Sequence, residues 1–219
     1  IEILPLFVED WGIKNKADFM ARRITMQSMK TFFRFKNYPG ELNTPSRVNV
    51  YNALAAIAAA RIFSVDAYDI IRRLGEFQFP DSRFQIMKVN GLNVIDDGYN
   101  ANPVSFRCAI EAFKELPSCG RKLMVMADML ELGEAKEDLH RMLGKELASA
   151  GIDMIIALGP LSHIACDAAV SCGYNPQAVH KCSSWQEARD IVSACAKKHD
   201  TVLFKGSHSM KLDEVLKGQ

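Results

Sequence analysis

The chain has 219 residues, of which 48% are hydrophobic and 24% are charged, values typical of a globular protein that is long enough to bury a substantial core. Lysine and arginine together number 27 against 26 acidic residues, so the net charge of +1 gives no electrostatic reason to expect a nucleic acid or a membrane as partner. The longest apolar stretch, residues 53–60, is far too short to cross a bilayer.

The first 79 residues contain few recognisable elements. Residues 31–35 are typical of a strand, residues 37–46 of a loop with two prolines and a glycine, and residues 49–63 and 65–74 of helices. The elements expected in this stretch are too few to form an independent hydrophobic core. Because Ile1 is not Met and residues 1–8 lack the basic start of a signal peptide, we expect the sequence to begin inside a longer polypeptide.

Strand-like and helical segments alternate after a linker at residues 78–83. Asn90-Gly91 predicts a two-residue hairpin between strands at 84–89 and 92–95. Further strands are expected at 122–127, 154–158, 178–180 and 201–204, and helices at 103–116, 134–150, 161–172, 185–198 and from 210. Such alternation is typical of a mostly parallel sheet covered on both faces. The sequence therefore predicts an α/β protein in which residues 84–219 form a Rossmann-like domain with an antiparallel edge strand.

A polar octapeptide, Asp-Asp-Gly-Tyr-Asn-Ala-Asn-Pro at residues 96–103, directly follows one predicted strand. Asn102 suits a helix N-cap and Pro103 the first helical position. In open parallel sheets, ligands bind where such strand-to-helix turns meet. A simple turn is the alternative, because Asp, Asn and Gly also form turns. Tyr99, Asn100 and Asn102 add more polar groups than a turn requires, which favours a functional site.

Two further loops are expected at the same edge of the sheet. Lys205 begins the sequence Lys-Gly-Ser-His-Ser, which could bind an anion at a helix N-terminus or simply cap that helix with serine. Asp128 follows the strand at 122–127, whereas His140, on the next helix, is more typical of a structural histidine. The sequence contains neither Gly-x4-Gly-Lys-Ser/Thr nor Gly-x-Gly-x-x-Gly, so it carries no recognisable phosphate-binding loop.

The six cysteines form no Cys-x-x-Cys pair, which is typical of free thiols in a reducing cytosol. A zinc site is the alternative, with ligands drawn from His163, Cys166, Cys172, His180 and Cys182. Their spacing fits no common zinc-finger pattern.

Several of these motifs together resemble the Mur ligase family. They are Val-Ile-Asp-Asp-Gly-Tyr-Asn-Ala-Asn-Pro at 94–103, Asp-Met-Leu-Glu-Leu-Gly at 128–133 and Phe-Lys-Gly-Ser-His-Ser-Met-Lys at 204–211, in the family's order. Residues 49–56 resemble the family's nucleotide-facing helix. The resemblance implies that residues 1–79 are the end of a central ATPase domain and residues 84–219 the C-terminal domain. It places the UDP-sugar domain and the Gly-Lys-Thr loop upstream of Ile1.

The resemblance also implies an activity, the ATP-dependent formation of an amide bond in peptidoglycan precursor synthesis. A carboxylate of UDP-MurNAc-tripeptide would attack ATP to give an acyl phosphate, and the amine of D-Ala-D-Ala would displace the phosphate. ATP is thus an implied substrate, and the ligands of Mg²⁺ would lie mostly outside these residues, with no metal site within them. A cytoplasmic monomer is expected. Without the phosphate loop, we expect no complete catalytic set and no ligase activity from this chain alone.

By the same resemblance, Asn49 and Asn52 would contact adenine, and Arg83 and Asp97 the ribose region of the nucleotide. The implied substrate-binding residues are Tyr99, Asn100, Asn102, Asp128, Lys205, Ser207 and His208. Val48, Gly98 and Ala127 stand where the family usually has His, Ser and Gly. Because of these departures, a non-catalytic paralogue that only binds nucleotide or substrate is one alternative function. Another Mur-type or folylpolyglutamate-type ligase is a further alternative.

Overall fold

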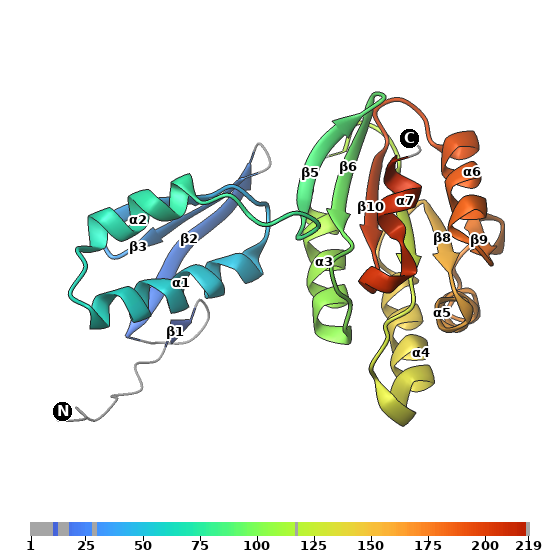
Figure 1. The fold of residues 1–219 in the computed structure, drawn as a ribbon, viewed down its shortest axis with the longest axis horizontal. Coiled ribbons are helices and arrows are strands. Elements are labelled where there is room, and N and C mark those ends of the chain that lie inside the picture. Colours follow the sequence, from blue (N-terminus) through green and yellow to red (C-terminus); the bar gives the residue numbers. More distant parts are fainter. Residues whose placement is uncertain (1–10, 13–17, 28–29, 117, 218–219) are drawn as a thin grey trace. The chain divides into compact units, whose positions relative to one another are not determined.

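The computed structural model describes residues 11–12, 18–27, 30–116 and 118–217, and the chain divides into two units between Phe79 and Pro80 (Figure 1). The boundary falls inside the linker expected at 78–83. The expectation about Ile1 lies outside the described residues. Among the helices described, none is long and apolar enough to span a bilayer.

The first unit pairs a small sheet with two helices. Its strands follow the order β1 (Trp11–Gly12), β2 (Phe19–Gln27), β3 (Lys30–Phe35), β4 (Tyr38–Leu42), with β2 to β4 antiparallel and β1 parallel to β2. The helices are α1 (Arg47–Ile62) and α2 (Ala67–Glu76). Their apolar faces pack on the sheet in one core, built from Phe19, Phe33, Phe35, Leu42, Val50, Leu54, Ile57, Ile70 and Ile71. This core is fuller than the sequence suggests.

The expectation of a loop throughout residues 37–46 was wrong, because Tyr38–Leu42 form strand β4. Pro39 is tolerated because β4 is an edge strand of this sheet. Gly40 leaves room for the ring of Phe33, which lies where a side chain at Gly40 would begin. The residues that suggested a loop therefore serve a strand. Strand β2 was also not predicted from the sequence. Its pairing with β3 shifts register between Arg22 and Thr25, and this shift interrupts the alternation of apolar and polar residues that marks a strand.

The second unit has the predicted mostly parallel sheet. Its strands are β5 (Gln85–Val89), β6 (Leu92–Asp97), β7 (Lys122–Ala127), β8 (Met154–Leu158), β9 (Val179–Cys182) and β10 (Thr201–Lys205). They lie in the order β5-β6-β10-β7-β8-β9, and β5 alone among these strands is antiparallel. Asn90 and Gly91 both have positive φ, at 48° and 85°, as the predicted hairpin turn requires. The α/β fold class is confirmed.

Helices cover both faces of this sheet. They are α3 (Pro103–Glu115), α4 (Lys136–Leu147), α5 (Pro160–Ser171), α6 (Trp185–Cys195) and α7 (Leu212–Lys217). Residues of α6 and α7 share a core cluster with alternate residues of the strands, such as Val94, Val125 and Phe204. The intervening residues point to the opposite face, where Lys205 lies over the ring of Phe106 on α3. The last helix begins later than expected, because Lys211 adopts a left-handed conformation with φ 57° before Leu212.

Local signals set where two of these helices begin. The Asn102 side chain accepts a hydrogen bond from the Ser105 N–H at 2.8 Å, and the Ser105 hydroxyl accepts from the Asn102 N–H at 3.1 Å, a complete capping box for α3. Ser184 accepts a hydrogen bond from the Glu187 N–H at 3.2 Å and caps α6, while the Glu187 carboxylate accepts from the Ser183 N–H at 2.8 Å. The cap at Asn102 matches the sequence prediction.

Helices α4 and α5 approach each other closely at Gly144. A Cβ atom at this position would overlap the carbonyl oxygen of Ala165 and come within 2.7 Å of the Cβ of Ala168. The absence of a side chain at Gly144 therefore sets the distance between the two helices.

Candidate functional site

Three loops meet at the carboxyl edge of the central strands. Lys205, the last residue of β10, is in register with Asp97 on β6 and with Met126 on β7, so the loops that follow these strands start at one level. The Ser207 hydroxyl accepts a hydrogen bond from the Leu130 N–H at 3.0 Å, which ties the loop after β10 to the loop after β7. The sequence prediction that these loops lie side by side is correct.

Asp97 and Lys205 form a buried ion pair. The Lys205 side chain is 1% exposed, and its Nζ lies 2.8 Å from Asp97 Oδ2. Burial raises the pKa of the Asp97 carboxyl above its ordinary value, although the Lys205 ammonium and a hydrogen bond from the Phe84 N–H oppose that rise. The Asp97 carboxylate therefore faces protein groups on both of its oxygens.

Other polar residues of the octapeptide also serve its own turn. Asp96 accepts hydrogen bonds from the Ser82 hydroxyl at 2.7 Å and from the Gly98 N–H at 3.0 Å. The Asn100 side-chain oxygen accepts from the Ala101 N–H at 2.7 Å, while the side chain of Asn102 caps α3. The side chains of Asp96 and Asn102 thus make the contacts expected of a simple turn. Tyr99, by contrast, is half exposed, and Asn100 is exposed.

Asp128 is the first residue of the loop after β7, and its side chain is buried. Its carboxylate accepts hydrogen bonds from the Ser162 N–H at 2.7 Å and the Leu161 N–H at 3.3 Å, in the first turn of α5. A Cβ atom at Gly159 would lie 2.6 Å from this carboxylate, and Gly159 has φ +105°. Asp128 therefore fills the N-terminus of α5, a favourable place for a negative charge.

His140 supports the same loop, as the sequence predicted for a structural histidine. It is fully buried, and its Nε2 accepts a hydrogen bond from the Met129 N–H at 3.1 Å. Its Nδ1 donates to the carbonyl oxygen of Lys136 at 2.6 Å. This pair of contacts specifies the neutral ring with its proton on Nδ1.

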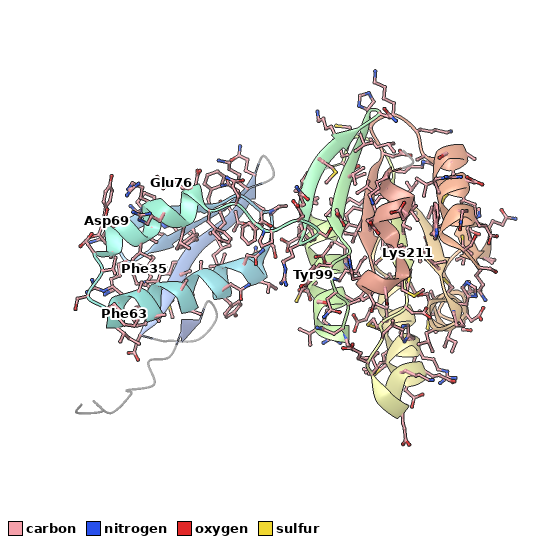
Figure 2. The ribbon with its side chains drawn as sticks, in the orientation of Figure 1. Phe35, Phe63, Asp69, Glu76, Tyr99 and Lys211 are labelled. Carbon is pink, nitrogen blue, oxygen red and sulfur yellow. The ribbon has the colours of Figure 1, made fainter. Side chains whose placement is uncertain are left out.

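An exposed layer of three side chains stands above this buried scaffold. The Arg83 guanidinium lies 4.3 Å from the centroid of the Tyr99 ring, and the rings of Tyr99 and His208 are 6.2 Å apart. The Tyr99 N–H donates to the carbonyl oxygen of Ser82 at 3.0 Å, which fixes the loop beneath the stack. Figure 2 shows Tyr99 beside the carboxyl end of β6. A cation, a phenol and an imidazole are thus presented together, a set able to contact an anionic or planar ligand.

A cavity of about 470 Å³ adjoins this layer at His208. The remaining residues that line it are Trp185, Ser209, Lys211, Asp213 and Glu214. Sequence reasoning missed these residues as a group. Ser209 and Lys211 lie within the motif at 204–211. Trp185, Asp213 and Glu214 carry no sequence signal, because α6 and α7 come together only in the folded unit.

The two asparagines of the first unit lie on one face of α1, as their spacing predicts. Asn52 Nδ2 donates to Asn49 Oδ1 at 3.0 Å, and Asn49 Nδ2 donates to the Thr44 hydroxyl at 3.5 Å. The start of α1 is anchored nearby, where the Thr31 hydroxyl donates to the Thr44 carbonyl oxygen at 2.6 Å. Asn52 is exposed, so an amide edge is presented to solvent in a fixed orientation.

The described residues include no group of three or more His, Cys, Asp or Glu side chains arranged to hold a metal ion. The carboxylates of Asp96, Asp97 and Asp128 are each engaged by protein groups. The residues of the zinc alternative therefore form no ligand set in the part of the chain that the structure describes. All six cysteines are free thiols.

The fold and these loops define an α/β protein that presents exposed cationic and aromatic side chains at the carboxyl edge of a mostly parallel sheet. Residues 82–208 match the family model described as "Mur ligase, glutamate ligase domain". The chain belongs to the Mur ligase family.

Named relatives agree with this assignment. The UDP-N-acetylmuramoyl-tripeptide–D-alanyl-D-alanine ligase of Bacillus subtilis is 30% identical over 213 residues, which cover 94% of this chain and 46% of the relative. The UDP-N-acetylmuramate–L-alanine ligase of Alkaliphilus metalliredigens is 37% identical over 121 residues, 52% of this chain and 26% of the relative. A crystal structure of MurF from Acinetobacter baumannii superposes with a TM-score of 0.83 at 26% identity and covers 95% of this chain and 46% of that one. The chain thus spans about half the length of these D-alanyl-D-alanine-adding relatives.

Proposed function

We propose that this chain serves an ATP-dependent ligase that adds D-Ala-D-Ala to UDP-MurNAc-tripeptide through an acyl phosphate. One observation carries the choice of substrates. The D-alanyl-D-alanine ligase of Bacillus subtilis matches 94% of the chain, hence both units, whereas the L-alanine ligase matches 52%. In this proposal residues 1–79 are the end of the central ATPase domain and residues 84–219 the C-terminal domain.

The exposed layer of the second unit supports the chemistry. A carboxylate is a poor electrophile, so it must be phosphorylated before an amine can attack it, and phosphoryl transfer depends mainly on positioning and on neutralising charge. Arg83 supplies a permanent cation, and Tyr99 holds it in place through the ring contact. We assign Arg83 and Asp97 to the nucleotide side of the site, and Tyr99, Asn100 and His208 to the reacting substrates. Asn102, Asp128 and Ser207 shape the loops on which these groups stand.

The first unit contributes the adenine contact in this proposal. Amide groups pair with the donor and acceptor edge of a purine, and Asn49 and Asn52 are already oriented by their mutual hydrogen bond. The family resemblance implies Mg²⁺, but we assign it no ligand among the described residues. A monomer in the cytoplasm, with nucleotide-linked and dipeptide substrates and no nucleic-acid or membrane partner, completes the proposal.

The test is the release of ADP by the product of the complete gene. With ATP, UDP-MurNAc-tripeptide and D-Ala-D-Ala, we expect ADP together with a product whose mass equals the two substrates less one water. Omission of either substrate should abolish the product. A product formed only from UDP-MurNAc and L-Ala would favour the L-alanine ligase, which the 37% identity over 121 residues keeps as a second candidate. Calorimetric binding of ATP without any product would instead indicate a non-catalytic paralogue.

A further inference from the structure

Lys205 is a lysine whose charged end is enclosed by protein. Its register position opposite Asp97 on a neighbouring parallel strand directs both side chains to the same face of the sheet. There the Lys205 ammonium lies 5.6 Å from the centroid of the Phe106 ring on α3, and the side chain is 1% exposed. Removing an ammonium from water is costly, so its surroundings must replace the lost hydration with well-placed acceptors.

The protein supplies those acceptors in full. An ammonium group has three N–H donors. Lys205 Nζ lies 2.8 Å from Asp97 Oδ2, 2.9 Å from the carbonyl oxygen of Asn100 and 3.3 Å from the carbonyl oxygen of Asp97. Every donor therefore has an oxygen partner at the end of β6 or in the loop after it, and none is left for a phosphate or carboxylate of a ligand.

These contacts fix the part of the loop that carries Tyr99. Lys205 anchors the loop at the carbonyl oxygen of Asn100, and two residues later the capping box of Asn102 begins α3. On the other side, the Phe84 N–H holds Asp97. Tyr99 stands between these anchors, with its own N–H bound to Ser82. The direction in which Tyr99 and Asn100 project thus depends on the Lys205 ammonium.

We infer that Lys205 is a positioning residue, whose ammonium shapes the Asp97–Asn102 loop and does not contact the substrates. The sequence had placed Lys205 among the substrate-binding residues, and the inference replaces that role. It rests on the proposed function, because the groups that Lys205 positions are those assigned to the reacting substrates.

The first experiment is Lys205→Met in the product of the complete gene. Methionine keeps the apolar stem but removes the charge and all three donors. Because a displacement of about 1 Å in a positioning group can cost about 100-fold in rate, we expect kcat to fall by about that factor. The KM values for ATP and for D-Ala-D-Ala should each change by less than about 2-fold, since the lost contact is not made to either substrate.

Two control variants distinguish the loss of loop positioning from the loss of a positive charge and from a general loss of stability. Lys181→Met removes a lysine on β9 that pairs with Asp167 at 2.6 Å in an exposed position. Val192→Ala opens the core beneath α6 and should lower the melting temperature without touching the loop. Both controls should keep the wild-type kcat. A selective rise in one KM for Lys205→Met, or a kcat within about 3-fold of wild type, overturns the inference.

A second measurement uses the wild-type protein, in case Lys205→Met does not fold. The probe is an amine-acetylating reagent, with mass spectrometry to locate the modified lysines. Lys205 should stay unmodified in the native protein with or without ATP and become modified after unfolding, while Lys181 reacts throughout. Acetylation of native Lys205 that saturating ATP or D-Ala-D-Ala prevents would show a ligand contact and overturn the inference. This measurement does not depend on catalytic turnover. If the wild-type protein were inactive, the proposed function would be refuted, but the labelling would still show whether Lys205 contacts a ligand.

Discussion

Asp128 Oδ1 accepts a hydrogen bond from the Ser162 N–H at 2.7 Å, and this contact joins the loop after β7 to the first turn of α5. A carboxylate there satisfies N–H groups that have no partner within the helix and also complements the helix dipole. Asp128→Ala should therefore destabilise α5 by about 1–2 kcal/mol. The measurement is hydrogen exchange of the α5 amides with increasing urea.

Asp167→Ala is the matched control on the same helix. Asp167 forms a surface ion pair with Lys181, and such exposed pairs contribute about 0–1 kcal/mol. Equal effects of the two substitutions on the α5 amides would contradict the capping role of Asp128.

Gly144→Ala should destabilise the contact between α4 and α5. Alanine is the better helix former by about 1 kcal/mol, but its Cβ would overlap the carbonyl oxygen of Ala165 and force the helices apart. Overpacking of this kind costs about 1–3 kcal/mol, so the net effect should be a loss of stability. Gly75→Ala on α2 is the control, because its Cβ would meet only ordinary contacts, the nearest being Glu41 Cγ at 3.4 Å. Hydrogen exchange should show that Gly144→Ala lowers the stability of α4, whereas Gly75→Ala raises the stability of α2.

Asp200 should make the second unit sensitive to acid. Burial raises the pKa of its carboxyl, but hydrogen bonds from Arg121 and from the Lys197 N–H outweigh burial, so the folded-state pKa lies below the ordinary value. A depressed pKa stabilises the fold above the unfolded value of about 3.9, and this stabilisation is lost as the pH falls through the folded value. The melting temperatures of wild type and Asp200→Asn should therefore differ near neutral pH and converge in acid. A difference that does not change with pH would contradict this role.

Tyr99→Ala in the product of the complete gene should lower the proposed ligase activity without loss of stability. The Tyr99 side chain is 51% exposed, so truncation leaves no cavity in the core. It removes the ring beneath Arg83 and beside His208, and we expect kcat/KM to fall by about 10- to 100-fold, the scale of a lost positioning contact. Val104→Ala, at an exposed position on α3 nearby, should leave kcat/KM and the melting temperature unchanged.

Thiol labelling should divide the cysteines into two classes. Burial raises the pKa of Cys166 to about 12 and that of Cys182 to about 11, so neither forms the reactive thiolate near neutral pH. Cys119 and Cys172 are exposed. Alkylation of the native protein at pH 8 should modify the exposed pair first, and mass spectrometry should find Cys166 and Cys182 modified only after unfolding. Early labelling of Cys166 would contradict its buried environment.

The parts of the fold that the sequence predicts are those set by neighbouring residues. Asn90-Gly91 determines the hairpin, and Asn102 with Pro103 determines the start of α3, because each signal acts over a few residues. The segments 122–127 and 154–158, apolar except for Lys122, predict the boundaries of β7 and β8 without error. Strand β4 was missed because Pro39 and Gly40 indicate a loop unless the facing Phe33 ring is known.

The sequence locates the candidate site, but it does not show which of its residues face a ligand and which hold the loops in place. Sequence places Asp97, Asp128 and Lys205 at strand ends and marks all three as possible ligand contacts. Their actual partners are distant, since Lys205 bonds to Asn100 from 105 residues away and Asp128 to Ser162 from 34. A charged side chain at a strand end looks the same in sequence whether it faces a ligand or a buried partner.

The order of strands in the second unit has a consequence for synthesis on the ribosome. Strands β6 and β7 each pair with β10 and not with each other, although β10 is the last of them to be translated. A nascent chain that has emerged only as far as Cys195 therefore holds two incomplete half-sheets with an open gap between them. Residues 201–205 close that gap and deliver the partner of Asp97 in the same step. The loop that carries Tyr99 can take its final form only when the central strand arrives, so the carboxyl edge of this unit is completed only after β10 has been translated.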